Sequence, residues 1–376
     1  MKRGIFLGFL IFSFCSSPAW SQRSAPRPYW YSLEQGKFFF RNGDYGKALM
    51  AFEEARRDRR NMYTRMEQDM IDLLSIPEVR YLGDSLERIE TYIKDRYQVN
   101  AETALEELYY RYPKAALEGS AYRALEEIGR LKDFPEAEYW IGETFRIEGE
   151  LGVALGQYQK AHVQRAFLEN PSFDTEILYR MVDILKAKQD YAEMENRALE
   201  IIQQDSLWIG GSGAVTKNAM TTILENRDNG IRRFLTIYRY NNIAVERAHR
   251  LLGLYYYASG RHKQAAEHLM FSFLIQNTVL IEELIRNQYD FTFTTLDNLM
   301  QEVMRRPVLV TYIQDVEYYK TLYYFAAALY SDGNTKQSPA RRLWTFLSGH
   351  PDAGEWSGKA KMQLRTPFVE KVVEMP

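Results

Sequence analysis

Residues 36–55 read GKFFFRNGDYGKALMAFEEA, and the spacing of their small and aromatic residues recurs twice further along the chain. The first copy consists of Gly36, Phe39, Gly43, Tyr45, Ala48, Phe52 and Ala55. The same offsets from Gly142 give Phe145, Gly149, Leu151, Ala154, Tyr158 and Ala161. From Gly253 they give Tyr256, Gly260, His262, Ala265, Leu269 and Ser272. Three ungapped matches indicate an internal repeat.

Each position of the pattern has a physical role in a pair of antiparallel helices. The first glycine allows the two helices to approach closely, and the aromatic residue three positions later fills the space above that contact. The second glycine opens the turn between the helices, often with a positive φ. The alanine is the small residue that the second helix turns towards the first. Because one such hairpin cannot bury its own faces, we expect the hairpins to stack.

At these residues the chain resembles the tetratricopeptide-repeat (TPR) family of exported bacterial type, whose repeat of about 34 residues carries Gly-x2-Tyr and Ala-x3-Phe elements. The resemblance implies an all-α solenoid, a right-handed superhelix of helix-turn-helix repeats. Weaker copies are predicted over 182–198 and 326–351, and weaker helices over 218–238 and 276–304. Helix pairs are also expected around 64–96 and 102–130. Period-two alternation is rare, and its best example, residues 291–295, is short enough to be a loop.

The first residues are typical of a secretory leader. Lys2 and Arg3 precede an apolar stretch over 4–14, and Ala19 and Ser21 offer small side chains at the two positions that a signal peptidase inspects, which predicts cleavage before Gln22. We therefore expect a signal peptide at 1–21, with an uncleaved anchor as the alternative, and a periplasmic product. The single cysteine, Cys15, lies within this leader, so the mature chain is expected to have no disulfide. No later apolar run is long enough to cross a membrane.

Beyond the leader the sequence predicts a short linker at 22–29 and three helical regions, at 30–130, 131–305 and 306–376. The 48 basic and 50 acidic residues leave a formal net charge of −2, with no basic excess that would favour nucleic acid. The run over 56–60, rich in arginine, is expected to end a second helix, where cations suit the helix dipole.

No catalytic or cofactor motif is evident. The five histidines lack metal-ligand spacing, so neither a metal nor another cofactor is expected. The glycine-rich loop at 208–217 has its lysine in the wrong place for a phosphate-binding loop. Adjacent acidic pairs such as Glu106 and Glu107 point apart on a helix. We therefore expect a binding protein and not an enzyme.

The resemblance also implies that the first helices of the repeats line an inner groove that binds peptides or helices. The residues that match the groove-facing positions are Trp30, Leu33, Lys37 and Phe40 in the first copy, Tyr139, Glu143 and Arg146 in the second, and Arg247, Arg250, Leu254 and Tyr257 in the third. Aromatic and arginine side chains favour protein interfaces. The alternative for Trp30 and Phe40 is that they cap the N-terminal end of the stack. The leading hypothesis is a periplasmic scaffold for other cell-envelope proteins. The alternative is a transporter-associated carrier of a small apolar ligand, lined by the tyrosines at 255–257, 318–319 and 323–324.

Overall fold

The computed structural model describes residues 28–74, 88, 91, 133–205, 218–223, 230–333 and 337–370. The chain divides into two compact units, Met1–Thr144 and Phe145–Pro376, which are described separately. Every regular element within the described residues is helical, so the all-α prediction is confirmed there. The unit boundary lies inside a helix, Pro135–Ile147, and differs from the predicted divisions after residues 130 and 305.

The first unit is built on a helical hairpin. Helix α1 (Tyr29–Arg41) packs along α2 (Tyr45–Leu74), and α6 (Pro135–Ile147) contributes its residues up to Thr144. The indole of Trp140 stacks on the Phe52 ring, with 5.9 Å between ring centroids, and meets Phe40 edge-on at 5.3 Å. These aromatic contacts fix α6 against the hairpin, because aromatic pairs contribute beyond the area they bury.

The second unit begins with α7 (Leu151–Val163), the 3-10 turn η2 (Arg165–Phe167), α8 (Phe173–Ala187) and α9 (Tyr191–Gln203). Helix α9 begins where the Asp190 carboxylate accepts a hydrogen bond from the Glu193 amide at 3.3 Å. The His162 ring on α7 lies 2.7 Å from Asp174 on α8 and 2.9 Å from Glu200 on α9. This buried imidazole therefore joins three helices.

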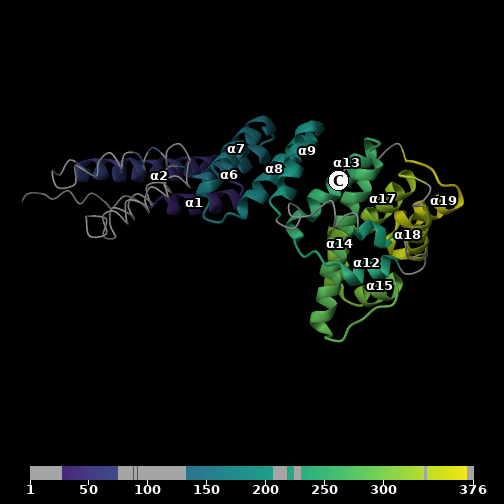
Figure 1. Cartoon of the computed structure of the whole chain (residues 1–376). Helices are drawn as coiled ribbons and strands as arrows, with labels where there is room; N and C mark the ends of the chain where they lie inside the picture. The colour runs from purple at the N-terminus through teal and green to yellow at the C-terminus, as the bar shows by residue number, and fades with distance from the viewer. Residues whose placement is uncertain are drawn as a thin grey trace, which may run out of the picture. The chain divides into compact units, whose positions relative to one another are not determined.

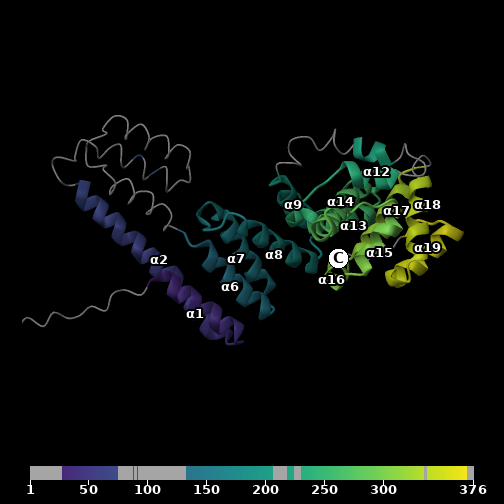
Figure 2. The same ribbon diagram turned by 90° about the horizontal axis from the view of Figure 1, so that it is seen from below.

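The remaining elements of the second unit include one helix, His262–Asn287, that is much longer than the others. They are α12 (Gly230–Ile237), η3 (Ile243–Val245), α13 (Glu246–Ala258), α14 (His262–Asn287), α15 (Leu296–Met304), α16 (Pro307–Asp315), α17 (Tyr318–Ser331), α18 (Gln337–Gly349), η5 (Pro351–Ala353) and α19 (Glu355–Arg365). Helix α14 packs between α13 and α17, and α18 and α19 follow in order, as Figures 1 and 2 show from two directions.

Helix α14 also has the length and hydropathy of a membrane span, the only described helix that does. However, 78% of its most apolar window is buried inside the chain. Its apolar side chains therefore already have partners in α13 and α17, and the helix is only weak evidence for a membrane span.

The repeat glycines occupy the two kinds of position that the pattern requires. Gly43, Gly149 and Gly260 lie in the interhelical turns with φ of 77°, 85° and 75°. A Cβ on Gly36 would lie 2.4 Å from the Phe52 ring, and one on Gly253 would lie 2.5 Å from the Leu269 side chain. The residue at offset 16 thus packs directly on the first glycine in both hairpins.

Gly253→Leu is expected to lower the free energy of unfolding by about 1–3 kcal/mol, because the added side chain overpacks the α13–α14 contact. The matched control is Gly358→Ala on α19, where an added Cβ meets nothing within 4 Å. That change should instead stabilise its helix by up to about 1 kcal/mol. Urea denaturation of both variants measures the difference, and equal effects would contradict the close-contact role of Gly253.

Two sequence predictions need correction. The arginine-rich run at 56–60 does not end a helix, since α2 continues to Leu74. Within it the Arg59 guanidinium is buried, 4.4 Å from the Phe134 ring centroid and 5.1 Å from that of Tyr29. The second helices are also longer than a repeat of about 34 residues allows, with 30 residues in α2 and 26 in α14.

Some of the predicted segments correspond to described loops or helices, and others lie outside the described residues. Residues 291–295 form a non-helical loop, as anticipated, that ends at Thr295, the N-cap of α15. The expected helix at 276–304 is in fact the second half of α14, a loop and α15. The leader, the linker up to residue 27, nearly all of the helix pairs expected after residue 74 and the loop at 208–217 lie outside the described residues.

Candidate functional site

The residues assigned to repeat packing lie in the helical hairpins, and most are buried. Ala48, Phe52, Ala154, Tyr158 and Ala265 have no exposed surface. The weaker copy over 182–198 coincides with the hairpin of α8 and α9. The copy that begins at residue 326 coincides with that of α17 and α18.

The residues predicted to face a partner fall into two groups. Trp30 on α1 is 56% exposed, and Lys37, Phe40, Arg146 and Arg247 are half-buried. The Lys37 ammonium lies 2.6 Å from the Glu34 carboxylate and 5.9 Å from the centroid of the Trp140 ring. Arg247 pairs with Asp183 and lies over the Tyr179 ring.

The second group consists of Tyr139, Arg250 and Tyr257, which are buried with 4%, 7% and 2% of their surface exposed. This burial differs from the expectation for a groove surface. The reason is that the faces of α6 and α13 that carry them are buried and not open to solvent. Their side chains serve internal packing and hydrogen bonding in this structure.

Helix α1 presents an aromatic face that the sequence prediction identified only in part. Tyr31 is 41% exposed and Phe38 is 61% exposed, beside Trp30. The i, i+4 and i+8 spacing places Trp30, Glu34 and Phe38 along one side of the helix, while Leu33 and Gly36 are buried. The Tyr31 hydroxyl accepts a hydrogen bond from Gln35 at 3.0 Å. This α1 face, defined by Trp30, Tyr31 and Phe38, is an aromatic surface with polar neighbours.

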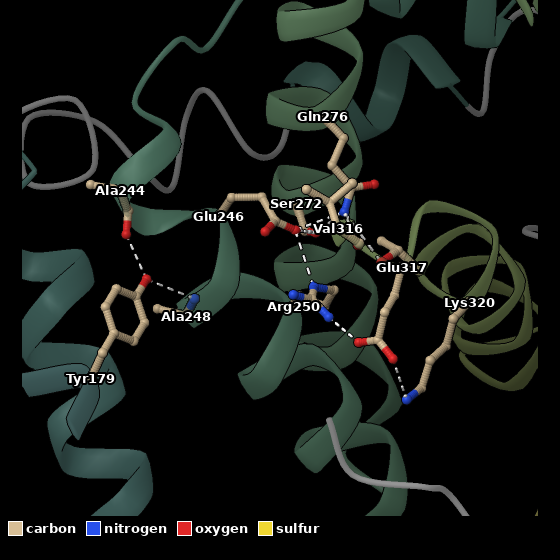
Figure 3. A network of polar contacts seen from close by, with 11 residues as sticks. Tyr179, Ala244, Glu246, Ala248, Arg250, Ser272, Gln276, Val316, Glu317 and Lys320 are labelled. Atoms are coloured by element: carbon tan, nitrogen blue, oxygen red, sulfur yellow. Dashed lines mark hydrogen bonds and ion pairs between the residues drawn. The ribbon is translucent and has the colours of Figure 1, made fainter. Parts of the chain in front are cut away.

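A buried polar network, drawn in Figure 3, joins α13, α14 and α17. One carboxylate oxygen of Glu246 accepts hydrogen bonds from the Ser272 hydroxyl at 2.7 Å and the Gln276 amide at 2.7 Å. It also accepts one from the Arg250 guanidinium at 3.3 Å. The Gln276 amide further donates to the Val316 carbonyl at 3.0 Å. The network thus places a charged group at the contact of three helices.

The outer edge of this network is formed by Glu317 and Lys320. Arg250 pairs with Glu317, whose other carboxylate oxygen lies 3.1 Å from the Lys320 ammonium. Glu317 has a left-handed backbone with φ of 48° at the start of α17, a conformation that is costly for a residue with a side chain. The four charges, two acidic and two basic, alternate along the chain of contacts and balance.

Tyr179 connects α8 to the same region (Figure 3). Its hydroxyl donates to the Ala244 carbonyl at 2.5 Å and accepts from the Ala248 amide at 3.2 Å. Burial raises the pKa of this phenol well above its ordinary value, so it remains neutral. The contact anchors the N-terminal end of α13, where Glu246 lies.

Two buried histidines form a second unusual feature. The Nδ1 atoms of His249 on α13 and His268 on α14 lie 3.1 Å apart. Burial holds the pKa of His249 well below 6.5, helped by the neighbouring His268, and lowers that of His268 to about 4 against the attraction of Glu195. Two neutral imidazoles satisfy this contact, since one nitrogen donates and the other accepts.

An open cleft of about 410 Å³ lies where α17 and α19 begin. Tyr318, Tyr319 and Trp356 line it, together with the charged side chains Glu317, Lys320, Asp352 and Glu355. Burial, with a contribution from Asp352, raises the pKa of Tyr319 to about 12. The cleft contains two of the tyrosines assigned to the ligand-carrier alternative, but its charged lining does not suit an apolar ligand.

The C-terminal segment 366–370, hereafter the tail, follows α19 without helical structure and lies against α17 and α13. The buried side-chain amide of Gln363 binds both main-chain polar groups of Phe368. It donates to the carbonyl at 3.0 Å and accepts from the N–H at 2.9 Å. The Tyr323 hydroxyl donates to the Glu370 carboxylate at 2.6 Å. Tyr257, predicted to contact a partner, accepts a hydrogen bond from the Glu370 amide at 3.3 Å.

No group of three or more potential metal ligands occurs among the residues that the structure describes. The chain is similar to an uncharacterized protein of Treponema pallidum (strain Nichols), with 23% identity over 336 residues, which is 89% of each chain. An uncharacterized protein of Borreliella burgdorferi (strain ATCC 35210 / DSM 4680 / CIP 102532 / B31) is 20% identical over 251 residues, 62% of this chain and 78% of the relative. No family model matches the chain, and no solved structure does.

Proposed function

We propose that the chain is a periplasmic scaffold of TPR type that binds other cell-envelope proteins, delivered there by the leader at 1–21. The observation that carries the proposal is the α1 face, on which Trp30, Tyr31 and Phe38 expose 56%, 41% and 61% of their surface. Exposed aromatic side chains grouped on one surface with polar neighbours are typical of protein interaction sites. The recurring hairpins, with glycines in their turns and contacts, support the TPR assignment.

Loss of the α1 face is expected to remove captured partners. We expect Trp30→Ser combined with Phe38→Ser to reduce crosslinked envelope proteins by about tenfold or more, since two central aromatic contacts contribute about 2 kcal/mol or more to an interface. In-cell crosslinking of the tagged chain, followed by mass spectrometry of specific captured proteins, measures this. Both side chains are exposed, so the melting temperature should change little.

The matched control is Val308→Ser, which changes a 77% exposed apolar residue on α16 in the other unit. It should leave the captured proteins unchanged. Equal capture by wild type and by the Trp30 and Phe38 variant would contradict a role for the α1 face. Retention of a small molecule in native mass spectrometry, with no captured protein, would instead support the ligand-carrier alternative.

A further inference from the structure

The tail is bound mainly through its backbone and one acidic side chain. Phe368 and Val369 keep 42% and 46% of their surface exposed, so neither is buried as a core residue would be. Burial of apolar area therefore contributes little to holding this segment in place. The tail is held instead by hydrogen bonds that join Phe368 and Glu370 to side chains of α13, α17 and α19.

The contact of Gln363 with Phe368 is a form of main-chain recognition. A carboxamide that binds the N–H and the C=O of one residue reproduces the pairing that a neighbouring strand would offer. Gln363 has no exposed surface, and its amide also donates to the Tyr323 hydroxyl at 3.1 Å. The amide is thus held in position, and the contact does not depend on which side chain residue 368 carries.

The acidic side chain of the tail is bound by neutral donors. Tyr323 donates to the Glu370 carboxylate at 2.6 Å, and the Tyr324 phenol is near enough for this carboxylate to raise its pKa. Burial and this carboxylate raise the pKa values of both phenols well above 10, so both keep the protons they donate. The tyrosine hydroxyls together select an acidic group at this position of an extended segment.

We propose, on the basis of the proposed scaffold function, that the surface formed by Tyr257, Tyr323, Tyr324 and Gln363 is a receptor site for an extended, acidic peptide segment of a partner protein, and that the tail occupies this site in the free chain. The partner segment resembles residues 368–370 in being extended and in carrying a glutamate or aspartate two residues after the one whose main chain Gln363 binds. Partner binding then requires displacement of the tail. The tail acts as a built-in competitor that sets the affinity of the site.

The tail competes with a free peptide for the site, and the strength of this competition depends on the short chain that links the tail to the site. A short linker presents its own segment at an effective concentration of about 1 mM. For a free peptide with a dissociation constant of about 100 μM, the tail lowers the apparent affinity about tenfold. Weakening the tail in the full chain with Phe368→Pro and Glu370→Lys should therefore tighten peptide binding about tenfold, because proline at 368 has no N–H for Gln363 and lysine cannot accept from Tyr323.

The test titrates a fluorescein-labelled peptide of sequence TPFVEK, that of residues 366–371, into the full chain by fluorescence anisotropy. The tail variant should bind it about tenfold more tightly than wild type. Adding Tyr323→Phe, which removes only the hydroxyl, should lower affinity by about tenfold, whereas Tyr289→Phe, at a 95% exposed tyrosine, should not. A peptide with lysine in place of the glutamate should bind at least about tenfold more weakly.

A second measurement does not depend on the stability of the tail variant. In a chain with Cys15→Ser and Val369→Cys, an environment-sensitive dye at residue 369 reports release of the tail when unlabelled TPFVEK is added. No dye response together with equal peptide affinity for wild type and tail variant overturns the proposal. If envelope proteins are still captured through the α1 face in that case, the scaffold function stands and only this receptor site fails.

Discussion

Glu246→Ala is expected to lower the free energy of unfolding by about 3–5 kcal/mol, a typical cost of breaking a buried ion pair from one side. The change leaves the Ser272 hydroxyl, the Gln276 amide and the Arg250 Nε without their shared acceptor in a region closed to water. Arg250 keeps its pairing with Glu317, but its charge is no longer balanced within the core. Urea denaturation followed by circular dichroism measures the loss.

The control for this prediction is Glu355→Ala, which breaks an exposed pair with Lys359 on α19. Because exposed pairs contribute little, the expected change is below about 1 kcal/mol. Replacing Glu246 and Arg250 together by methionine should recover part of the loss, since it removes the unpaired charge along with its partner. A loss below about 1 kcal/mol for Glu246→Ala would show that the network does not stabilise the contact of the three helices.

The hairpins were predictable because their determinants are local. Gly36 and Phe52, or Gly253 and Leu269, are only 16 residues apart, and a fixed spacing forces them together in any helical hairpin. The lengths of α2 and α14 were misjudged because the repeat implied that each second helix would end early. A signal was available: residues 47–74 and 262–287 contain neither glycine nor proline, so nothing in the sequence ends these helices.

The candidate sites were less predictable because their partners are distant in sequence. Glu246 contacts residues 26 and 30 positions away, and Glu370 contacts Tyr257 across 113 positions. In the sequence, polar residues such as Ser272 and Gln276 are typical of a solvent-exposed helix face. In the fold, the packing of α17 covers them. The same reason explains why Arg250 and Tyr257 were assigned to a partner surface. Spacing within one repeat identifies the helix face, but not what covers that face.

Acidification is expected to destabilise the second unit through the histidine pair. Unfolded histidines have pKa values near 6.5, whereas burial lowers that of His268 to about 4 and that of His249 well below 6.5. A group with a lowered folded pKa contributes stability above its unfolded pKa, and that contribution is lost as the pH falls from about 6.5 to 4. For His268 alone the shift corresponds to about 3 kcal/mol over this range.

The comparison that isolates this effect is the pH dependence of the free energy of unfolding in wild type and in His249→Gln combined with His268→Gln. Glutamine keeps a donor and an acceptor but has no titratable group, so between pH 7 and pH 4 the variant should lose at least about 3 kcal/mol less than wild type, the contribution of His268 alone, with that of His249 in addition. Carboxylates that do not interact with the pair titrate alike in both proteins, and their contribution cancels in the difference. Parallel curves would mean that both histidines accept protons in the folded state. The two rings would then have to separate, because two protonated Nδ1 atoms cannot remain 3.1 Å apart as donor and acceptor.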